Sequence, residues 1–390
     1  MQRSFYSLVA SGAALIACCY GLARFGYGLF TPVLTDEFGL SSTAVGAIAA
    51  TSYVGYCAAI TVSAGLTRRA GPRTVAVGAG VVATVGMTVV ALAPSAWVLA
   101  AGILVAGAST GVASPPLAAA ISQRMGGAAG DRAQTIVNAG TGVGVLVSGP
   151  IAFALFDNWR WAWGVYAAIA AAVTAWVAFA VTGGPDSSAR TLPTRRWRDG
   201  SAGLVVASSM TGIGSIAVWS FGRDLISSQG SASVAVASVA WTVLGAAGIA
   251  GGLGGDVMQR LGFRRAWIGT TVAMAFATVL LALATSSVVA IMLSVAIFGA
   301  TYIGLTGLLL VWSTRVYPDS PSLGVGLSFF TVAVGQALGA PVAGVLIELL
   351  GATTTFVAFA VLGVTAVAVR PATAPAANQG SGPEGHAGAA

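Results

Sequence analysis

The chain of 390 residues contains no lysine and a single histidine, and only 7% of its residues are charged. A soluble domain carries about a quarter charged residues, so this chain has too little polar surface to face water on every side. With 56% hydrophobic residues, the composition also excludes a disordered chain. The class that remains is an integral membrane protein.

The scarce residue types also exclude several kinds of chemistry. Cys18, Cys19 and Cys57 lie in apolar runs, without CxxC spacing and without a neighbouring histidine. We interpret them as buried apolar side chains and predict neither a disulfide nor a metal site. The sequence has no Walker P-loop, HExxH motif or carboxylate pair, which excludes drive by ATP hydrolysis and disfavours a membrane-embedded enzyme. We therefore predict no enzymatic activity and no cofactor.

Apolar runs of roughly 20 residues, enough to cross a bilayer as a helix, recur along the chain. We predict an all-α integral membrane protein with twelve transmembrane helices in two pseudo-symmetric six-helix bundles, residues 1–181 and 201–370. Polar residues 182–200 form the linker between the bundles, and residues 371–390 a disordered tail. The first span is retained rather than cleaved as a signal peptide. The predicted spans are residues 7–31, 43–66, 74–93, 97–121, 134–155, 160–181, 202–225, 234–256, 266–285, 288–313, 322–347 and 353–369.

All 18 basic residues are arginine, and their positions indicate the orientation of the chain. If the N-terminus is cytoplasmic, all arginines except Arg24, Arg160 and Arg223 fall on the cytoplasmic side. Such an asymmetry follows the positive-inside rule. We predict a multi-pass protein of the cytoplasmic (inner) membrane with both termini in the cytoplasm. The net charge of +7 therefore indicates topology rather than a nucleic-acid partner.

Two parts of the sequence repeat at one offset. Gly71 and Gly262 are 191 positions apart, and so are Pro150 and Pro341. A shared offset at two distant places indicates an internal duplication. Duplicated halves around a central linker are the plan of a two-domain secondary transporter.

The loops after the second and eighth spans, AGLTRRAGPR and GGDVMQRLGFRR, resemble a cytoplasmic loop motif of the major facilitator superfamily. In that family a glycine-rich helix end, an acidic residue and arginines latch the two domains. Both loops lack the motif's aspartate, because Arg68 and Gln259 stand at its position. Only the second loop has an acidic residue nearby, Asp256, so Asp256 with Arg260 is the better candidate pair. The alternative is that these arginines only fix the topology. The latch residues that the resemblance implies are Arg69, Gly71, Arg73, Asp256, Arg260, Gly262, Arg264 and Arg265.

Spans five and eleven contain NAGTGVGVLVSGP and VAVGQALGAPVAG, which resemble the glycine–proline motif of the superfamily's proton-coupled exporters. Glycines let helices approach closely and prolines permit bends, so simple packing is the alternative interpretation. The adjacent prolines of the fourth span are expected to bend or break it. The segment YGLARFGYGLFTP resembles the YbfB/YjiJ-like branch of the superfamily. The residues assigned to packing and bending are Pro115, Pro116, Gly144, Gly149, Pro150, Gly335, Gly339 and Pro341.

Arg24 is the candidate binding residue, because an ionisable side chain inside a span is costly and usually functional. Helical spacing predicts Tyr20, Arg24, Tyr27 and Thr31 on one face. The resemblance implies that this span borders the central cavity, so Arg24 would bind an anionic group that Tyr20 and Tyr27 orient. The alternative is an arginine satisfied by carbonyls or tyrosines within the N-terminal bundle. Further candidates to line the cavity, each with packing as the alternative role, are Asn138, Trp219, Trp241, Tyr302 and Gln336.

The function predicted from these features is secondary active transport of a small organic molecule by alternating access. The glycine–proline motif favours export. Arg24, and the absence of any acidic residue or histidine near the middle of a span, favour the alternative of uptake or exchange of an organic anion. A proton remains a candidate coupling ion, although no mid-span residue is suited to carry it. The expected partners are the substrate and the lipid bilayer, with the protein a monomer; a membrane sensor or enzyme is the remote alternative.

Overall fold

The computed structural model describes residues 2–125, 127–181, 197–229, 233–253, 260–318 and 321–370. All regular elements in these ranges are helices, which confirms the predicted all-α membrane fold. Ten of the described helices are long and apolar enough to cross a membrane, and the shorter apolar helices Ala235–Ala250 and Ala352–Ala368 occupy the other two predicted spans. The predicted tail and most of the predicted linker lie outside the described residues.

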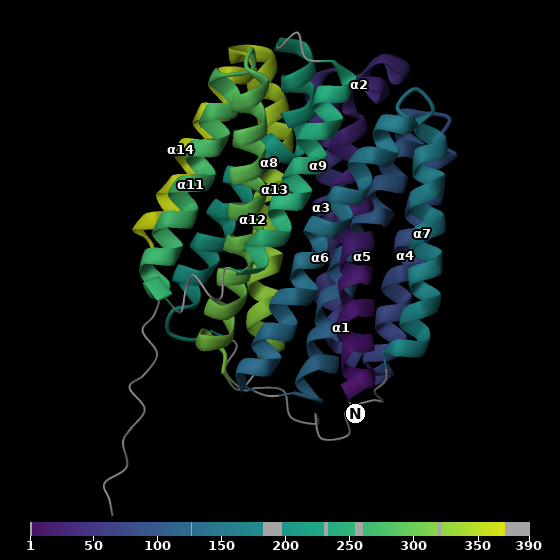
Figure 1. The fold of residues 1–390 in the computed structure, drawn as a ribbon, viewed down its shortest axis with the longest axis vertical. Coiled ribbons are helices and arrows are strands. Elements are labelled where there is room, and N and C mark those ends of the chain that lie inside the picture. Colours follow the sequence, from purple (N-terminus) through teal and green to yellow (C-terminus); the bar gives the residue numbers. More distant parts are fainter. Residues whose placement is uncertain are drawn as a thin grey trace, which may run out of the picture.

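The helices of residues 2–180, here the N-terminal half, lie together on one side of the molecule, and those of residues 201–368, the C-terminal half, on the other (Figure 1). The N-terminal half consists of α1 (Gln2–Ile16), the π-helix η1 (Ala17–Leu22), α2 (Gly26–Phe38), α3 (Ser42–Ala70), α4 (Pro72–Ala91), α5 (Ala96–Ser122), α6 (Gly127–Ala154) and α7 (Trp159–Ala180). The C-terminal half consists of α8 (Ser201–Gln229), α9 (Val234–Ala250), the 3-10 turn η2 (Gly251–Leu253), α11 (Phe263–Leu283), α12 (Val288–Val316), α13 (Pro321–Leu350), α14 (Ala352–Val364) and the 3-10 turn η3 (Thr365–Ala368).

Local sequence explains where several helices begin. Ser41, Ser233 and Ser287 are N-caps, and the side chain of each accepts a hydrogen bond from the backbone N–H three residues later. These bonds satisfy donors that have no partner inside the helix. Gly71 and Gly262 stand at the boundaries before α4 and α11 with φ of +83° and +81°, a conformation that glycine adopts without steric cost. Both glycines of the predicted loop motif therefore turn the chain in the same way.

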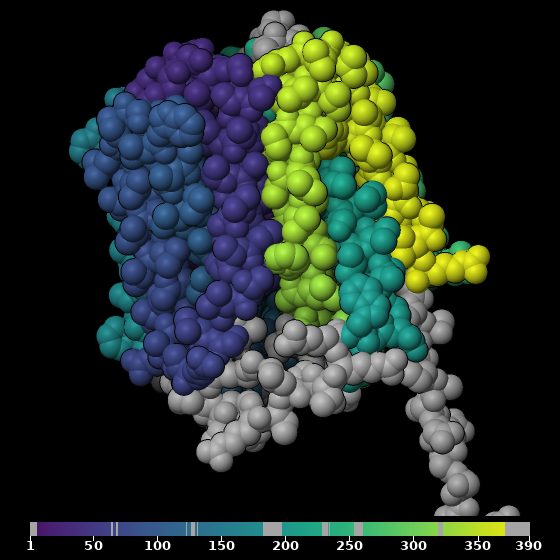
Figure 2. Space-filling view, turned by 180° about the vertical axis from the view of Figure 1, so that it is seen from behind, coloured from purple at the N-terminus to yellow at the C-terminus, as the bar shows by residue number. Residues whose placement is uncertain are grey.

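Two seams join the halves. Along one seam α3 packs against α13, and along the other α6 packs against α9; Figure 2 shows α3 beside the yellow-green α13. The offset of 191 residues relates α3 to α9 and α6 to α13, so the seams are equivalent in the internal repeat. At the centre, α2 meets α8 so closely that a Cβ on Gly28 would lie 2.1 Å from the carbonyl oxygen of Trp219.

Glycines of α6 and α13 lie at close helix contacts. A Cβ on Gly144 would lie 2.1 Å from the carbonyl oxygen of Ala17, and one on Gly335 would lie 2.4 Å from that of Ser209. The other two glycines face side chains: a Cβ on Gly149 would lie 2.1 Å from the hydroxyl of Thr242, and one on Gly339 would lie 2.9 Å from Ile216. Because glycine has no side chain, the neighbouring helices can approach this closely.

The prolines do not interrupt their helices. Pro150 lies inside α6 and Pro341 inside α13, and α5 continues through Pro115 and Pro116 to Ser122. Of the two expected effects of the proline pair in the fourth span, a break is therefore wrong, and a bend stays a prediction. The missing backbone donors are tolerated because α3 and α4 pack along α5 and hold it helical.

The two ends of the molecule differ in charge. Arginines lie at the ends of α3, α5 and α12 and at the starts of α4 and α11, and we call this the arginine-rich end; the N-terminus lies there too (Figure 1). Because the helices alternate in direction, the acidic residues that end α2 and α13, including Glu37 and Glu348, lie at the other end of the molecule, which we call the opposite end.

Candidate functional site

Arg24 lies at a break in the first membrane-spanning helix. The π-helical segment η1 ends just before it, and the N–H groups of Ala23 and Phe25 bond to carbonyls five residues earlier, Cys18 and Tyr20. π-Helical segments often mark functional sites, because the extra residue per turn redirects the following side chains. Arg24 is only 4% exposed, so the break places a guanidinium in the interior of the protein.

Four aromatic rings surround this guanidinium. Its central carbon lies 5.5 Å from the ring centre of Tyr20, 5.1 Å from Phe25, 4.7 Å from Tyr53 and 4.8 Å from Tyr56. A guanidinium at this range from a ring gains roughly 0.5–2 kcal/mol, more where water is excluded. We call these four rings the aromatic cage.

A hydrogen-bond network connects Arg24 to the C-terminal half. Its Nη2 donates to Oε1 of Gln336 on α13. The Nε2 atom of Gln336 in turn donates to the hydroxyls of Ser215 on α8 and Tyr302 on α12, each at 3.3 Å. The amide of Gln336 is therefore held in place on both sides, and one side chain connects Arg24 to three helices of the other half.

No carboxylate balances the charge of Arg24 within the described part of the chain. The one ion pair found there joins Arg160 to Glu37 at 2.7 Å, at the opposite end of the molecule. The Nε atom of Arg24 is buried and has no hydrogen-bond partner among the described residues. A buried cation with only neutral partners keeps much of its desolvation cost, which an incoming anion would offset.

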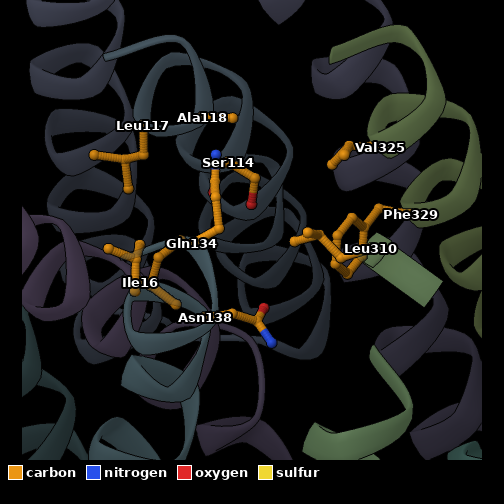
Figure 3. A pocket seen from close by; sticks show the side chains of 10 residues that line it. Ile16, Ser114, Leu117, Ala118, Gln134, Asn138, Leu310, Val325 and Phe329 are labelled. Carbon is orange, nitrogen blue, oxygen red and sulfur yellow. The ribbon is translucent and has the colours of Figure 1, made fainter. Parts of the chain in front are cut away.

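Arg24 lines a cavity between the two halves, together with Tyr20, Phe25, Asn138, Tyr302 and neighbouring residues. A second cavity shares Asn138 and Phe329 with the first. In Figure 3 the residues of the N-terminal half face Leu310, Val325 and Phe329 across this second cavity. It is formed by the parts of α5, α6, α12 and α13 nearest the arginine-rich end. Both cavities are small, with volumes of about 10 Å³ for the first and about 20 Å³ for the second.

An aromatic cluster stands behind the first cavity. Trp219 stacks on Phe25 with ring centres 3.7 Å apart, and Trp241, Phe298 and Tyr302 contact Trp219 edge-on at 5.9, 5.7 and 5.2 Å. Of the predicted lining residues, Tyr302 and Asn138 face the cavity, while Trp219 and Trp241 support its wall from behind. Asn138 also donates to the hydroxyl of Thr306 at 3.3 Å.

Tyr27 is not part of this site. Its hydroxyl donates to the carbonyl of Val45 on α3 at 3.1 Å, and it does not line the cavity. The expectation that Tyr20, Arg24 and Tyr27 share a face assumed regular α-helical spacing. The π-helical segment changes that spacing, so Tyr20 stays near Arg24 while Tyr27 turns toward α3.

Sequence reasoning missed three members of the cage: Phe25, which follows Arg24 in the chain, and Tyr53 and Tyr56 of α3. A signal was present, because tyrosine in membrane helices is enriched at the interfaces rather than in mid-span. Two tyrosines three residues apart in an otherwise small and apolar span therefore indicate a polar partner. The partner itself, on another helix, could not be read from local sequence.

Comparison with known proteins places this chain in a family. The family described as "Uncharacterised MFS-type transporter YbfB" matches residues 16–370. The chain belongs to this family of the major facilitator superfamily. It is thus a multi-pass membrane transporter of that type.

Solved structures agree on the fold of this transporter. It is similar to a mutant form of the nucleoside transporter NupG, with 14% identity and a TM-score of 0.73 over 93% of this chain and 98% of that one. It is also similar to a POT family transporter in complex with 5-aminolevulinic acid, with 13% identity and a TM-score of 0.75 over 94% and 95%. A search of curated proteins finds no match.

The loop motif of the transporter is described only in part. Both glycines turn the chain, and the arginines of the motif, Arg69, Arg73, Arg260, Arg264 and Arg265, are exposed at the arginine-rich end. Asp256, the acidic residue expected to pair with Arg260, lies outside the described residues. The latch therefore stays a prediction.

A second arginine is also buried. Arg223 is 1% exposed, and its Nη1 donates to the hydroxyl of Ser238 at 3.2 Å. Its guanidinium lies 4.5 Å from the ring centre of Phe156, which belongs to the other half. Arg223 therefore joins the halves near the opposite end, through a ring rather than a carboxylate.

Proposed function

We propose that this transporter carries a small organic anion across the membrane by alternating access, and that Arg24 binds the anionic group. The observation that carries the proposal is the environment of Arg24: it is 4% exposed, bordered by a cavity, and its Nη2 donates to the neutral amide of Gln336. A guanidinium binds a carboxylate more strongly than an amide, because both partners are charged.

Contacts between the halves support alternating access. At the opposite end the backbone N–H of Thr43 donates to Oε1 of Glu348 at 2.7 Å, and a Cβ on Gly344 would lie 2.4 Å from the carbonyl oxygen of Ser42. This end is tightly packed, whereas the two small cavities lie at Arg24 and between Arg24 and the arginine-rich end. Such an arrangement corresponds to one of the two states that a rocking transporter adopts.

The positive-inside rule supports placing the arginine-rich end in the cytoplasm and the protein in the cytoplasmic membrane. On that assignment the tightly packed end faces outward. The glycine–proline motif favours export; the lack of a mid-span carboxylate favours anion exchange or uptake instead. A sided transport assay separates these directions.

Binding is tested first, on the purified protein in detergent. We would measure the melting temperature with a panel of small carboxylates and with the matching amides, for wild type, Arg24→Gln, Arg24→Lys and the control Arg160→Gln. Carboxylates should raise the melting temperature of wild type and Arg160→Gln, and should leave Arg24→Gln unchanged. If they stabilise Arg24→Gln as much as wild type, Arg24 is structural and the proposal fails.

Transport is tested next, in proteoliposomes of known orientation with the anion that stabilises most. Flux of the anion from the cytoplasmic side to the outer side identifies export. If the same anion on the far side of the membrane accelerates that flux, the protein is an exchanger. A rate that follows an imposed pH gradient identifies proton coupling. Equal flux in liposomes without protein would overturn transport altogether.

A further inference from the structure

We propose that the substrate is an aromatic monocarboxylate, whose carboxylate binds Arg24 and whose ring lies against the aromatic wall of the cavity once the proposed rocking of the halves has widened it from its present volume of about 10 Å³. This inference rests on the proposed function and specifies its substrate class. Three features of the cavity carry it: a single charge, a wall of aromatic rings, and neutral polar groups among the lining residues.

The first feature is the single charge. Arg24 is the one ionisable cation among the residues that line the two cavities. One carboxylate would balance it. A second carboxylate on the same molecule would be buried beside Thr306, Phe329 and aliphatic side chains, without a cation, at a high desolvation cost. The cavity is therefore suited to a monoanion.

The second feature is the aromatic wall. Tyr20, Phe25, Tyr302 and Phe329 line the first cavity. Phe25 is fixed from behind by its 3.7 Å stack on Trp219, and Tyr302 is fixed by its contacts with Trp219 and Gln336. Rings held rigidly in this way favour a flat aromatic partner, since stacked and edge-on ring contacts add to simple apolar burial.

The third feature is the polar side. Asn138 and Thr141 of α6 and Thr306 of α12 line the same cavity. Asn138 reaches into the space between the halves in Figure 3 and donates to Thr306 at 3.3 Å. These neutral groups suit a hydroxyl on the ring, which could both donate and accept.

Gln336 shows where the carboxylate would bind. Its Oε1 accepts from Nη2 of Arg24, while its Nε2 is held by Ser215 and Tyr302. A carboxylate oxygen that takes the place of Oε1 would form a charge-assisted bond in the same direction. The neutral amide thus occupies the position of the anion when no substrate is bound.

The test uses the full-length protein in detergent and five probes with matched shapes: benzoate, 4-hydroxybenzoate, cyclohexanecarboxylate, benzamide and terephthalate. Affinity is taken from the concentration dependence of the melting temperature. Benzoate should bind about five- to tenfold tighter than cyclohexanecarboxylate. Benzamide and terephthalate should give no shift, and 4-hydroxybenzoate should bind tighter than benzoate.

Two variants locate the ring and the hydroxyl. Phe329→Leu should reduce the preference for benzoate over cyclohexanecarboxylate, whereas the control Phe38→Leu, whose ring contacts Trp159 outside the cavity, should preserve it. Asn138→Ala should remove the advantage of 4-hydroxybenzoate and retain binding of benzoate.

The outcomes separate this inference from the proposed function. If cyclohexanecarboxylate binds as tightly as benzoate, the aromatic substrate class is wrong while anion binding at Arg24 stands. If terephthalate binds as tightly as benzoate, the restriction to one charge is wrong. If none of the carboxylates shifts the melting temperature, and the aliphatic acids of the wider panel also fail, the proposed function itself is overturned.

Discussion

Arg24 of the N-terminal half donates a hydrogen bond to Gln336 of the C-terminal half, 312 positions later in the chain. The two side chains belong to helices that the proposed rocking motion would move relative to each other. The bond therefore links the occupancy of the site to the contact between the halves. A ligand that binds the guanidinium in place of Gln336 would also break one hydrogen bond between the two halves.

Replacing Gln336 by glutamate should supply an internal anion. We expect Gln336→Glu to raise the melting temperature and to weaken binding of organic anions at least about tenfold, or ~1.4 kcal/mol, because its carboxylate competes for Arg24. Isothermal titration or thermal shift with benzoate measures this change. Gln336→Met is the control of similar size without charge and should retain binding; unchanged affinity in Gln336→Glu would contradict the role of Arg24.

The aromatic cage should contribute measurably to stability. Tyr53 is 3% exposed and its ring lies 4.7 Å from the guanidinium carbon of Arg24. We expect Tyr53→Leu to be less stable than Tyr53→Phe by about 0.5–2 kcal/mol, the contribution of a ring to a buried cation. Chemical unfolding in detergent gives the difference. In an Arg24→Met background the stability difference between Tyr53→Leu and Tyr53→Phe should shrink. If the difference persists there, the ring of Tyr53 contributes through packing alone.

Helix contacts at glycine should tolerate no side chain. A Cβ on Gly144 would lie 2.1 Å from a carbonyl oxygen, whereas one on Gly78 would meet nothing within 4 Å. We expect Gly144→Ala to lower the melting temperature and the yield of folded protein. Gly78→Ala should be neutral or stabilising by roughly 0.5–1 kcal/mol, because alanine favours helix. Size-exclusion profiles with melting curves compare the two, and equal behaviour would contradict the close contact.

A cross-link at the opposite end should stop transport. Thr43 and Glu348 come together there, with the backbone N–H of Thr43 2.7 Å from the Glu348 carboxylate. We expect Thr43→Cys with Glu348→Cys, in a Cys57→Ser background, to lose flux on oxidation and to recover it on reduction. Each single cysteine is the control. Full flux in the cross-linked protein would exclude rocking at this seam.

The ion pair at the opposite end should contribute little to stability or to anion binding. Arg160 and Glu37 are 2.7 Å apart, but their side chains are 43% and 35% exposed. Pairs in such positions contribute about 0–1 kcal/mol. We expect Glu37→Gln to change the melting temperature only slightly and to leave anion binding unchanged. A large loss of binding would show that this pair, too, affects the site.

The fold was predictable from the sequence because the bilayer imposes a simple rule. Backbone groups in lipid must bond within their own helix, so each span needs a long apolar run, and such runs are visible in the sequence. Arg24 was identifiable for the same reason, since a charge in such a run is costly. Both features depend on one helix at a time.

The remainder of the site depends on more than one helix. Tyr53, Tyr56 and Gln336 meet Arg24 only after α3 and α13 have packed against the first span. The π-helical segment was also invisible, because its extra residue has no distinctive sequence, and the placement of Tyr27 was wrong for that reason. Periodicity predicts which residues share a helix face only where the helix is regular.

The contact between Gly28 and Trp219 bears on the history of the chain. The two residues are 191 positions apart, so they occupy the same place in the two repeats, and they touch where the first helix of one repeat meets the first helix of the other. An ancestral assembly of two identical copies would have placed the same residue on both sides of this contact. Two indoles would not fit there, and two glycines would leave the Arg24 cavity without its aromatic support. In one continuous chain the two positions can differ, with glycine on one side and, on the other, the indole that stacks on Phe25.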